Sequence, residues 1–215
     1  DVEGRRFIVA GDVADCGYFD EFSLGAWVHP SGKLGGTVIS RMTDAAQADG
    51  YCVQTRDGRI QVNLVKRWLD DAVRVETERS IGPDRWYHLM VTYDGSRQAK
   101  GITVYVDGKP EKLKVHLDFL NQTFGTKEPL RIGAGAGPDA RFHGAIDDVR
   151  VYNRCLSPEE IGIVAAADSI SDIVATPAAA RTPHQSHKIA AYFLENRASE
   201  PIRDAHRLVV SLRRE

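Results

Sequence analysis

Cysteine is scarce in this sequence, which has only Cys16, Cys52 and Cys155 among its 215 residues. No Cys-x-x-Cys pair or cysteine–histidine cluster occurs, and this excludes the common zinc and haem motifs. Three cysteines cannot all pair with one another. They are either small buried thiols or include one disulfide, whose two partners the sequence does not identify.

Long apolar runs and an excess of charge are also missing. No run approaches the roughly 18–20 apolar residues that span a bilayer, so we expect no membrane-spanning helix. The net charge is −2, from 28 basic and 30 acidic residues, which gives no electrostatic reason to expect nucleic acid as a partner. No basic and apolar leader opens the chain, which starts at Asp1, so we expect a segment cut from a longer protein.

The common enzyme motifs are absent as well. The sequence contains no Gly-x-Ser-x-Gly nucleophile elbow, no P-loop and no dinucleotide-binding fingerprint. We therefore expect that this chain is not an enzyme.

What the first 155 or so residues do contain is alternation. In the run 22–28, Phe22, Leu24, Ala26 and Val28 fall on one face of an extended chain, as in a half-buried strand. Asp57-Gly58 separates two further alternating runs and predicts a tight hairpin. About ten such runs, with a turn signal every 8–14 residues or so, predict an all-β fold of two antiparallel sheets.

The last sixty or so residues have helical signals instead. Ser157-Pro158-Glu159-Glu160 is a capping box with proline at the first helical position, and Thr182-Pro-His-Gln185 is a second one. Residues 175–180 predict a break, and the apolar spacing from Ile202 to Leu212 predicts an amphipathic helix. We expect a β-sandwich over residues 1–156 and, over 157–215, a helical extension or linker to a further domain.

Four motifs in the β portion occur in an order that resembles the laminin-G-like, concanavalin A-like lectin/glucanase domain. They are residues 22–28 (FSLGAWV), 86–95 (WYHLMVTYDG), 104–108 (VYVDG) and 144–154 (GAIDDVRVYNR). The resemblance covers about residues 3–165 and implies a jelly roll with one concave sheet. The helical tail is similar to the segment after this domain in large exported planctomycete proteins that also carry cytochrome-like domains. That similarity implies an exported location and further domains of the same polypeptide as partners.

The resemblance implies polysaccharide or another glycan as a ligand, bound by polar and aromatic side chains on the concave sheet. The candidate residues are Tyr51, Gln54, Asn63, Arg67 and Trp68. The alternative for each is an ordinary strand or loop residue. Trp27 and Trp86 lie inside predicted strands, and we expect both in the core.

The resemblance also implies a structural calcium ion, held by an aspartate of the last strand and by backbone carbonyls near the start of the chain. Asp147 is the candidate ligand, with Asp12 as the second carboxylate. The alternative is that Asp147 accepts hydrogen bonds from loop amides or pairs with Arg150.

Together these observations favour a non-catalytic, lectin-like carbohydrate-binding module of a larger exported bacterial protein. The alternative is a structural or protein-interaction domain without a glycan ligand. A glycoside hydrolase is least favoured, because hydrolases that this domain resembles carry Glu-x-Asp-x-x-Glu on one strand. Glu76-Thr-Glu78 provides two carboxylates without the third.

Overall fold

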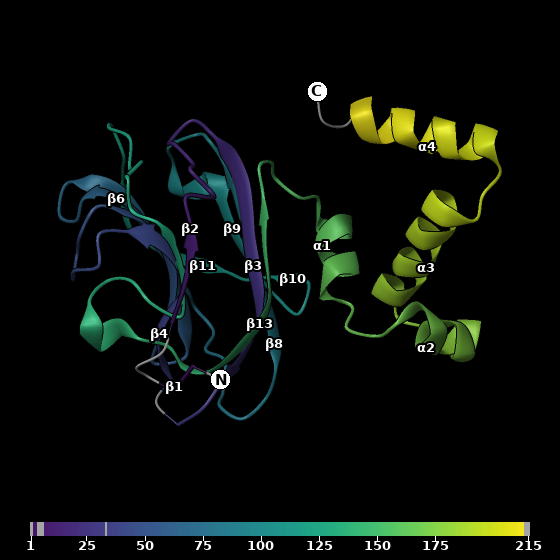
Figure 1. The fold of residues 1–215 in the computed structure, drawn as a ribbon, viewed down its shortest axis with the longest axis horizontal. Helices are drawn as coiled ribbons and strands as arrows, with labels where there is room; N and C mark the ends of the chain where they lie inside the picture. Colours follow the sequence, from purple (N-terminus) through teal and green to yellow (C-terminus); the bar gives the residue numbers. More distant parts are fainter. Residues whose placement is uncertain (1, 4–6, 33, 213–215) are drawn as a thin grey trace. The chain divides into compact units, whose positions relative to one another are not determined.

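The alternating runs of the β portion form two antiparallel sheets in the computed structural model, which describes residues 2–3, 7–32 and 34–212 (Figure 1). The six-stranded sheet has the strand order β1-β13-β3-β8-β9-β10, and the seven-stranded sheet has the order β11-β7-β6-β5-β4-β12-β2. The strands are β1 Val2–Glu3, β2 Ile8–Gly11, β3 Glu21–Pro30, β4 Gly35–Met42, β5 Gly50–Arg56, β6 Arg59–Arg67, β7 Asp71–Thr77, β8 Tyr87–Asp94, β9 Ile102–Val106, β10 Lys109–Pro110, β11 Leu113–Phe119, β12 Leu130–Ile132 and β13 His143–Tyr152.

Strands that are far apart in the sequence meet in both sheets. β13 pairs with β3, and β12 lies between β4 and β2. The ends of the β portion therefore close the sandwich around the hairpins between them. The predicted all-β, two-sheet antiparallel jelly roll is confirmed.

The core lies between the sheets and follows the predicted alternation. Phe22, Leu24, Ala26 and Val28 of β3 are all buried in it. Opposite them, Val53, Val62 and Val75 lie side by side on β5, β6 and β7 and face the same core. Since neighbours along a strand point to opposite sides, the residues between these valines line the outer face of the seven-stranded sheet.

Tight turns join the strands where Asp-Gly pairs predicted them. Asp57 and Gly58 have φ angles of 50° and 77°, and Asp107 and Gly108 have 51° and 75°. Positive φ at both central residues is the backbone of a type I′ turn, whose twist matches that of the flanking strands. The hairpin predicted between β5 and β6 is confirmed.

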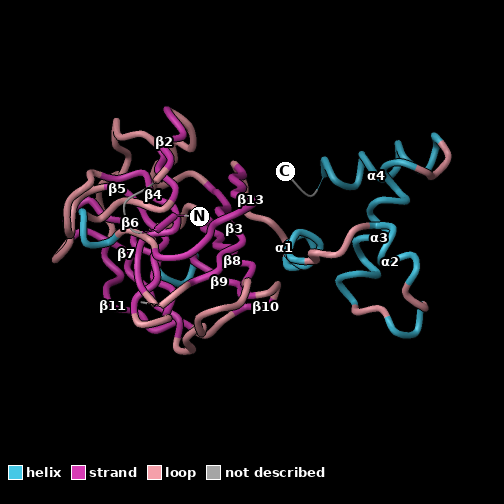
Figure 2. The backbone as a smooth tube through the Cα atoms, turned by 60° about the horizontal axis from the view of Figure 1, so that its bottom comes forward, coloured by secondary structure: helices cyan, strands magenta, loops and turns pink. Residues whose placement is uncertain are grey.

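The chain divides into two compact units, Asp1–Leu156 and Ser157–Glu215. Figure 2 shows strands in the first unit and helices in the second, apart from short 3-10 turns. The helices are α1 Pro158–Ala165, α2 Ile170–Ala175, α3 Pro183–Asn196 and α4 Glu200–Leu212, and the 3-10 turns are η1 Ala99–Gly101, η2 Pro138–Ala140 and η3 Ala178–Ala180. None of the helices in the described ranges is long and apolar enough to cross a membrane.

The helical unit forms as its capping signals predict. Ser157 with Glu160 and Thr182 with Gln185 both form complete capping boxes, at the starts of α1 and α3. Lys188 of α3 donates hydrogen bonds to the carbonyls of Ala166 and Asp168, just past the end of α1. These bonds satisfy carbonyls that have no partner within the helix, and they hold α3 beside α1.

Candidate functional site

Three polar side chains cross the outer face of the seven-stranded sheet in one row. Gln54 of β5 lies opposite Gln61 of β6, which lies opposite Glu76 of β7. The amide of Gln54 donates to the Gln61 oxygen at 2.7 Å, and the amide of Gln61 donates to Glu76 at 2.5 Å. We call Gln54, Gln61 and Glu76 the polar ladder.

Glu76 at the end of the polar ladder is an ionised carboxylate that neighbouring side chains stabilise. Burial works to raise its pKa, but hydrogen bonds from Gln61 and Arg59 outweigh burial and lower that pKa. Arg59 lies 3.3 Å from one carboxylate oxygen and His116 lies 3.7 Å from the other. The carboxylate is therefore ionised at neutral pH and hydrogen-bonded, whereas a general acid needs a raised pKa.

A second row of side chains lies beside the polar ladder and makes far fewer hydrogen bonds. Asn63 of β6 lies between Cys52 of β5 and Arg74 of β7. Its amide donates to the Cys52 sulfur at 3.5 Å, a weak acceptor. The Arg74 guanidinium makes no hydrogen bond or ion pair with any residue in the described part of the chain, and its Nε is buried without a partner. Burial lowers the pKa of Arg74.

Trp68 covers the guanidinium from one side. It stands in the turn between β6 and β7, and the Arg74 guanidinium carbon lies 4.2 Å from the centre of its ring. Cation–π attraction holds the guanidinium plane against the indole. One face of Trp68 is thus occupied by Arg74, whose side chain is partly exposed.

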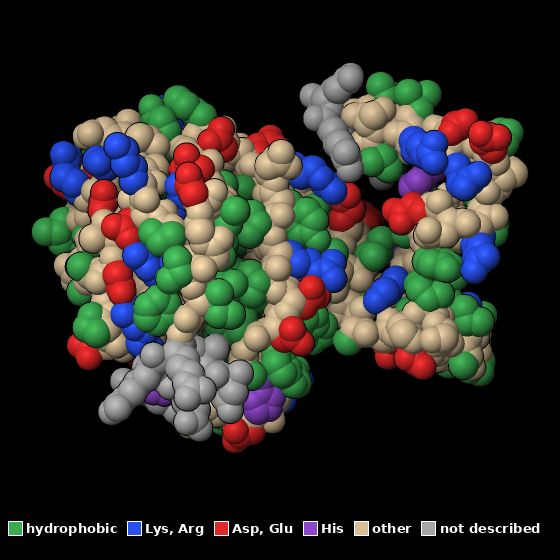
Figure 3. Space-filling model, viewed as in Figure 1, with side chains coloured by type: hydrophobic (Ala, Val, Ile, Leu, Met, Phe, Trp, Pro, Cys, Tyr) green, Lys and Arg blue, Asp and Glu red, His purple; other side chains and the backbone are tan. Residues whose placement is uncertain are grey.

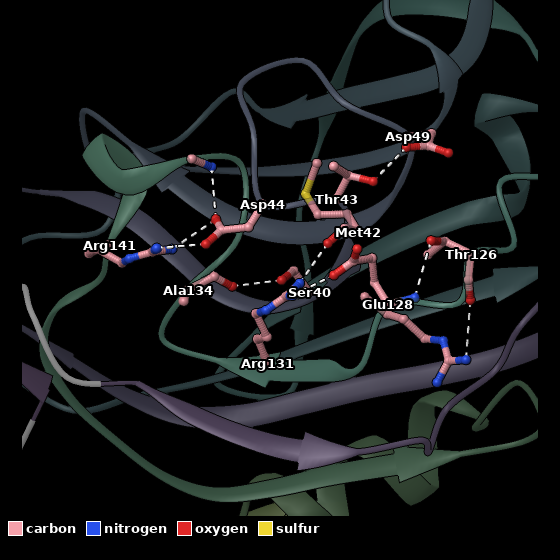
Figure 4. Close-up of polar contacts among 12 residues, drawn as sticks. Ser40, Met42, Thr43, Asp44, Asp49, Thr126, Glu128, Arg131, Ala134 and Arg141 are labelled. Carbon is pink, nitrogen blue, oxygen red and sulfur yellow. Dashed lines mark hydrogen bonds and ion pairs between the residues drawn. The ribbon is translucent and has the colours of Figure 1, made fainter.

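At its other end the outer face is covered by the loop between β12 and β13. Ser40 donates to the carbonyl of Ala134 at 2.6 Å, and Arg141 holds Asp44 through two hydrogen bonds of 2.9 and 2.6 Å. Figure 4 shows these contacts together with that of Arg131, which reaches the Met42 carbonyl and Glu128. The loop is therefore fixed to β4 and its turn at several points.

A hollow of about 590 Å³ opens where this loop meets the ladder. Its lining includes Gln54, the Gly35–Gly36 backbone and the loop residues 136–141. Gly36 has a φ of 127°, and a side chain there would meet the backbone of Arg141 at 2.3 Å. The glycine thus permits the close approach that shapes this wall.

The predicted glycan-binding residues fall into three groups. Gln54, Asn63 and Trp68 lie at the outer face described above, while Arg67 is exposed next to Trp68 and pairs with Asp70 at 2.9 Å. Tyr51 is 2% exposed in the core, where its hydroxyl donates to the Ala14 carbonyl, so its ring cannot meet a ligand on this face. Tyr51 and Gln54 are three positions apart on one strand, which already puts them on opposite faces.

Sequence reasoning missed Gln61, Arg74 and Glu76. All three belong to the outer face, because they alternate with the core residues Val62, Val73 and Val75. That alternation was the available signal. No sequence signal could have shown that Arg74 lacks a hydrogen bond or ion pair among the described residues, because this depends on which side chains of neighbouring strands come near it.

The expectation for the two tryptophans is also corrected. Trp86 is 44% exposed and Trp27 is half-buried, and neither belongs to the core. They lie on the outer face of the six-stranded sheet, where Trp86 packs against His29 and Trp27 packs against His88. The ring centres are 5.4 and 5.2 Å apart in these pairs.

The two candidate calcium ligands are not brought together. Asp12 follows β2 of the seven-stranded sheet and accepts a hydrogen bond from Arg41 at 2.8 Å. Asp147 lies in β13 of the six-stranded sheet and accepts from the Asp148 amide, while Arg150 pairs with Asp148. The described residues include no group of three or more His, Cys, Asp or Glu side chains that could hold a metal ion. Calcium binding by Asp147, with Asp12 as the second carboxylate, stays a prediction.

The three cysteines are free thiols. Burial raises the pKa of each to about 11, so all three are protonated at neutral pH and are poor nucleophiles. Cys155 donates to the Tyr93 carbonyl, which ties the end of the sandwich to β8.

Comparison with known proteins gives one match to a family model and many similar folds. Residues 7–162 match a laminin G-type model of the Concanavalin A-like lectin/glucanases superfamily. Over 144 residues the chain is 26% identical to Adhesion G-protein coupled receptor V1 of Danio rerio, which is 65% of this chain and 2% of that protein.

Two solved structures illustrate the similarity in fold. The binding domain of Paraclostridial Mosquitocidal Protein 1 matches with a TM-score of 0.56 and 13% identity, over 76% of this chain and 42% of that one. A candidate carbohydrate-binding protein from Bacteroides ovatus matches with a TM-score of 0.51 and 19% identity, over 72% of this chain and 43% of that one. At these identities the likeness shows the fold alone. Both names describe binding rather than catalysis.

Proposed function

Because the chain belongs to the Concanavalin A-like lectin/glucanases superfamily, we propose that it is a non-catalytic carbohydrate-binding module of a larger protein. The observation that carries this proposal is Arg74, a partly exposed guanidinium with no hydrogen bond or ion pair among the described residues, which lies beside Trp68 on the face that also carries Gln54. Sugars present many hydroxyl groups, and amides, carboxylates and guanidinium groups supply matching donors and acceptors. The candidate carbohydrate-binding protein from Bacteroides ovatus, with the same fold, supports the proposal.

The chemistry of the outer face argues for binding without hydrolysis. Retaining glycosidases place two carboxyl groups about 5–5.5 Å apart, one of them with a raised pKa. Here Glu76 lies between Gln61 and Lys114 in the sheet, and its pKa is lowered. A single ionised carboxylate that is already hydrogen-bonded can orient a sugar hydroxyl. It cannot act both as the general acid and as the nucleophile of a retaining glycosidase.

The proposal extends to an exported protein of the planctomycete type with further domains. The sequence of the complete gene tests this part directly. A leader before Asp1 and a cytochrome-like domain in the same polypeptide would support it, and a chain without either would contradict it.

Binding is tested by affinity gel electrophoresis of the full chain against a panel of plant and algal polysaccharides. We expect retardation by at least one of them. Gln54→Ala, at a partly exposed residue that lines the hollow, should weaken this binding about tenfold, as loss of one or two ligand hydrogen bonds does, while Asn196→Ala in α3 serves as the amide-to-alanine control. No retardation by any polysaccharide at millimolar sugar concentration would overturn the proposal.

The alternative is a protein-interaction domain, and the edge strand β2 is the observation that favours it. Ile8 and Val9 are 58% and 55% exposed on this strand, and Figure 3 shows hydrophobic side chains gathered over its part of the sandwich. An exposed apolar edge is a template for pairing with another segment. Concentration-dependent association that Val9→Lys abolishes, together with no polysaccharide binding, would favour this alternative.

A further inference from the structure

Arg74 differs from most arginines of the sandwich. Eight of the others hold a carboxylate within 4 Å, namely Arg41, Arg59, Arg67, Arg79, Arg85, Arg131, Arg141 and Arg150. Arg74 holds none among the described residues, although its Nε is buried. A partly desolvated guanidinium without a partner is costly, and its strongest partners are carboxylate, sulfate and phosphate oxygens.

The position of Arg74 suits an external anion. The guanidinium carbon lies 4.2 Å from the centre of the Trp68 ring, and none of its N–H groups makes a hydrogen bond among the described residues. On the two neighbouring strands, Asn63 and Leu117 lie opposite Arg74, and neither carries a charge. A rigid guanidinium with free N–H groups can bind an anion through two parallel hydrogen bonds at little conformational cost.

The local charge supports the same conclusion. The cations Arg59, Arg74 and Lys114 stand on this face around the carboxylate of Glu76, although the whole chain has a net charge of −2. The carboxylates of the Trp68 turn are already engaged. Asp70 pairs with Arg67, and Oδ1 of Asp71 accepts hydrogen bonds from the amides of Asn121 and Gln122, while its Oδ2 is buried without a hydrogen-bond partner.

We propose that the outer face of the seven-stranded sheet selects polysaccharides that bear carboxylate or sulfate groups, and that Arg74 binds this anionic group. This inference rests on the proposed carbohydrate-binding function and names its ligand class. Gln54, which lines the hollow, then contacts hydroxyl groups of the same chain, and Trp68 acts as a positioning residue for Arg74.

The experiment measures affinity of the full chain for two matched polymer pairs. Polygalacturonate is compared with its methyl ester, and dextran sulfate with dextran, so that only the charged group differs within a pair. We expect one anionic polymer to bind at least about tenfold more tightly than its neutral partner, as one charge-assisted hydrogen-bonded pair provides. The pair that shows the difference identifies carboxylate or sulfate as the group recognised.

Variants assign the preference to Arg74. Arg74→Gln should reduce the anionic affinity at least about tenfold, to that of the neutral polymer, and Arg74→Lys should restore it in part. Arg207→Gln in α4 makes the same charge change at an exposed residue that pairs with Asp204, and should leave affinity unchanged. Arg74→Gln loses the cation–π contact with Trp68 but also removes a partly desolvated charge that has no ion pair among the described residues, so we expect little change in Tm.

Each of the other outcomes contradicts a particular part of the proposal. Equal affinity for charged and neutral polymers, unchanged in Arg74→Gln, removes the anion preference and leaves carbohydrate binding standing. Equal losses in Arg74→Gln and Arg207→Gln show unspecific charge attraction and remove the role of Arg74. A clearly lowered Tm in Arg74→Gln would show that Arg74 stabilises the fold, and would contradict its role as a ligand-binding residue. No binding to these polymers or to the neutral panel removes the proposed function together with the inference.

Discussion

The outer faces of the two sheets carry different chemistry on the same framework. On the six-stranded sheet the rings of Trp27, His29, Trp86 and His88 pack against one another in pairs. On the seven-stranded sheet the corresponding positions carry amides and charges, and Arg74 stacks on Trp68 without a hydrogen bond or ion pair among the described residues. Ring contacts cover the first face, although Nδ1 of His88 there is buried without a hydrogen-bond partner, whereas the second face carries a guanidinium without a hydrogen bond or ion pair among the described residues. The proposed binding function therefore rests on the unpaired guanidinium of Arg74 and not on the number of aromatic rings on a face.

The largest effect on stability is expected from Gly135→Ala, in the loop that covers one end of the outer face of the seven-stranded sheet. Gly135 has a φ of 124°, and a Cβ there would lie 2.1 Å from the Ser40 hydroxyl. Backbone strain and overpacking together should cost about 3 kcal/mol of unfolding free energy, measured by urea denaturation. Gly32→Ala is the control, since its φ is 61° and no atom lies within 4 Å of the added carbon. Equal costs in both variants would show that the contact with Ser40 is unimportant.

The next effect is a pH dependence that belongs to the six-stranded face. Burial, with a smaller contribution from Arg150, lowers the pKa of His88 to about 4. In the unfolded chain this imidazole titrates near pH 6.5, so the unfolded state binds more protons between these values. Its contribution is fully present above about pH 6.5 and is lost as the pH falls toward 4, by at most about 3 kcal/mol.

His88→Phe should remove this part of the pH dependence, because a phenyl ring can pack against Trp27 without titrating. The measurement is the difference in unfolding free energy between pH 7 and pH 4.5 for the wild type and the variant. His116→Gln is the control on the other face, where the side chain is exposed beside Glu76. An identical pH dependence in wild type and His88→Phe would contradict the assignment.

A smaller effect separates the two faces directly. Trp68→Ala should weaken polysaccharide binding by up to about tenfold, because cation–π contact worth about 1 kcal/mol no longer orients Arg74. Trp86→Ala removes an aromatic ring from the other sheet and should leave affinity unchanged. Affinity electrophoresis of both variants decides the point. A greater loss in Trp86→Ala would move the binding site to the six-stranded face.

The smallest effect is expected from calcium. Asp12 accepts a hydrogen bond from Arg41, and Asp147 accepts one from the Asp148 amide. Because both carboxylates already have partners, we expect the same Tm in excess calcium and in chelator. A bound ion would instead stabilise by about 2.7 kcal/mol at one hundred times its dissociation constant. A rise in Tm with calcium that Asp147→Asn abolishes would establish a site on β13.

Much of the fold followed from local patterns. The alternation in residues 22–28, the Asp57-Gly58 turn and the capping boxes at Ser157 and Thr182 all gave correct elements. These signals are local, because strand period, turn backbone and helix caps depend on neighbours in sequence. Period-2 alternation would also have placed Tyr51 in the core and Arg74 on the outer face.

The candidate site depended on contacts between distant segments. Arg41 meets Asp12 across 29 positions, and Ala134 covers Ser40 across 94. Whether a charged side chain finds a partner is a property of the space around it, which no spacing in the chain encodes. Local sequence patterns therefore established strands, turns, caps and the class of side chain on each face. Packing established which of those side chains are satisfied, and left Arg74 without a partner in the described structure.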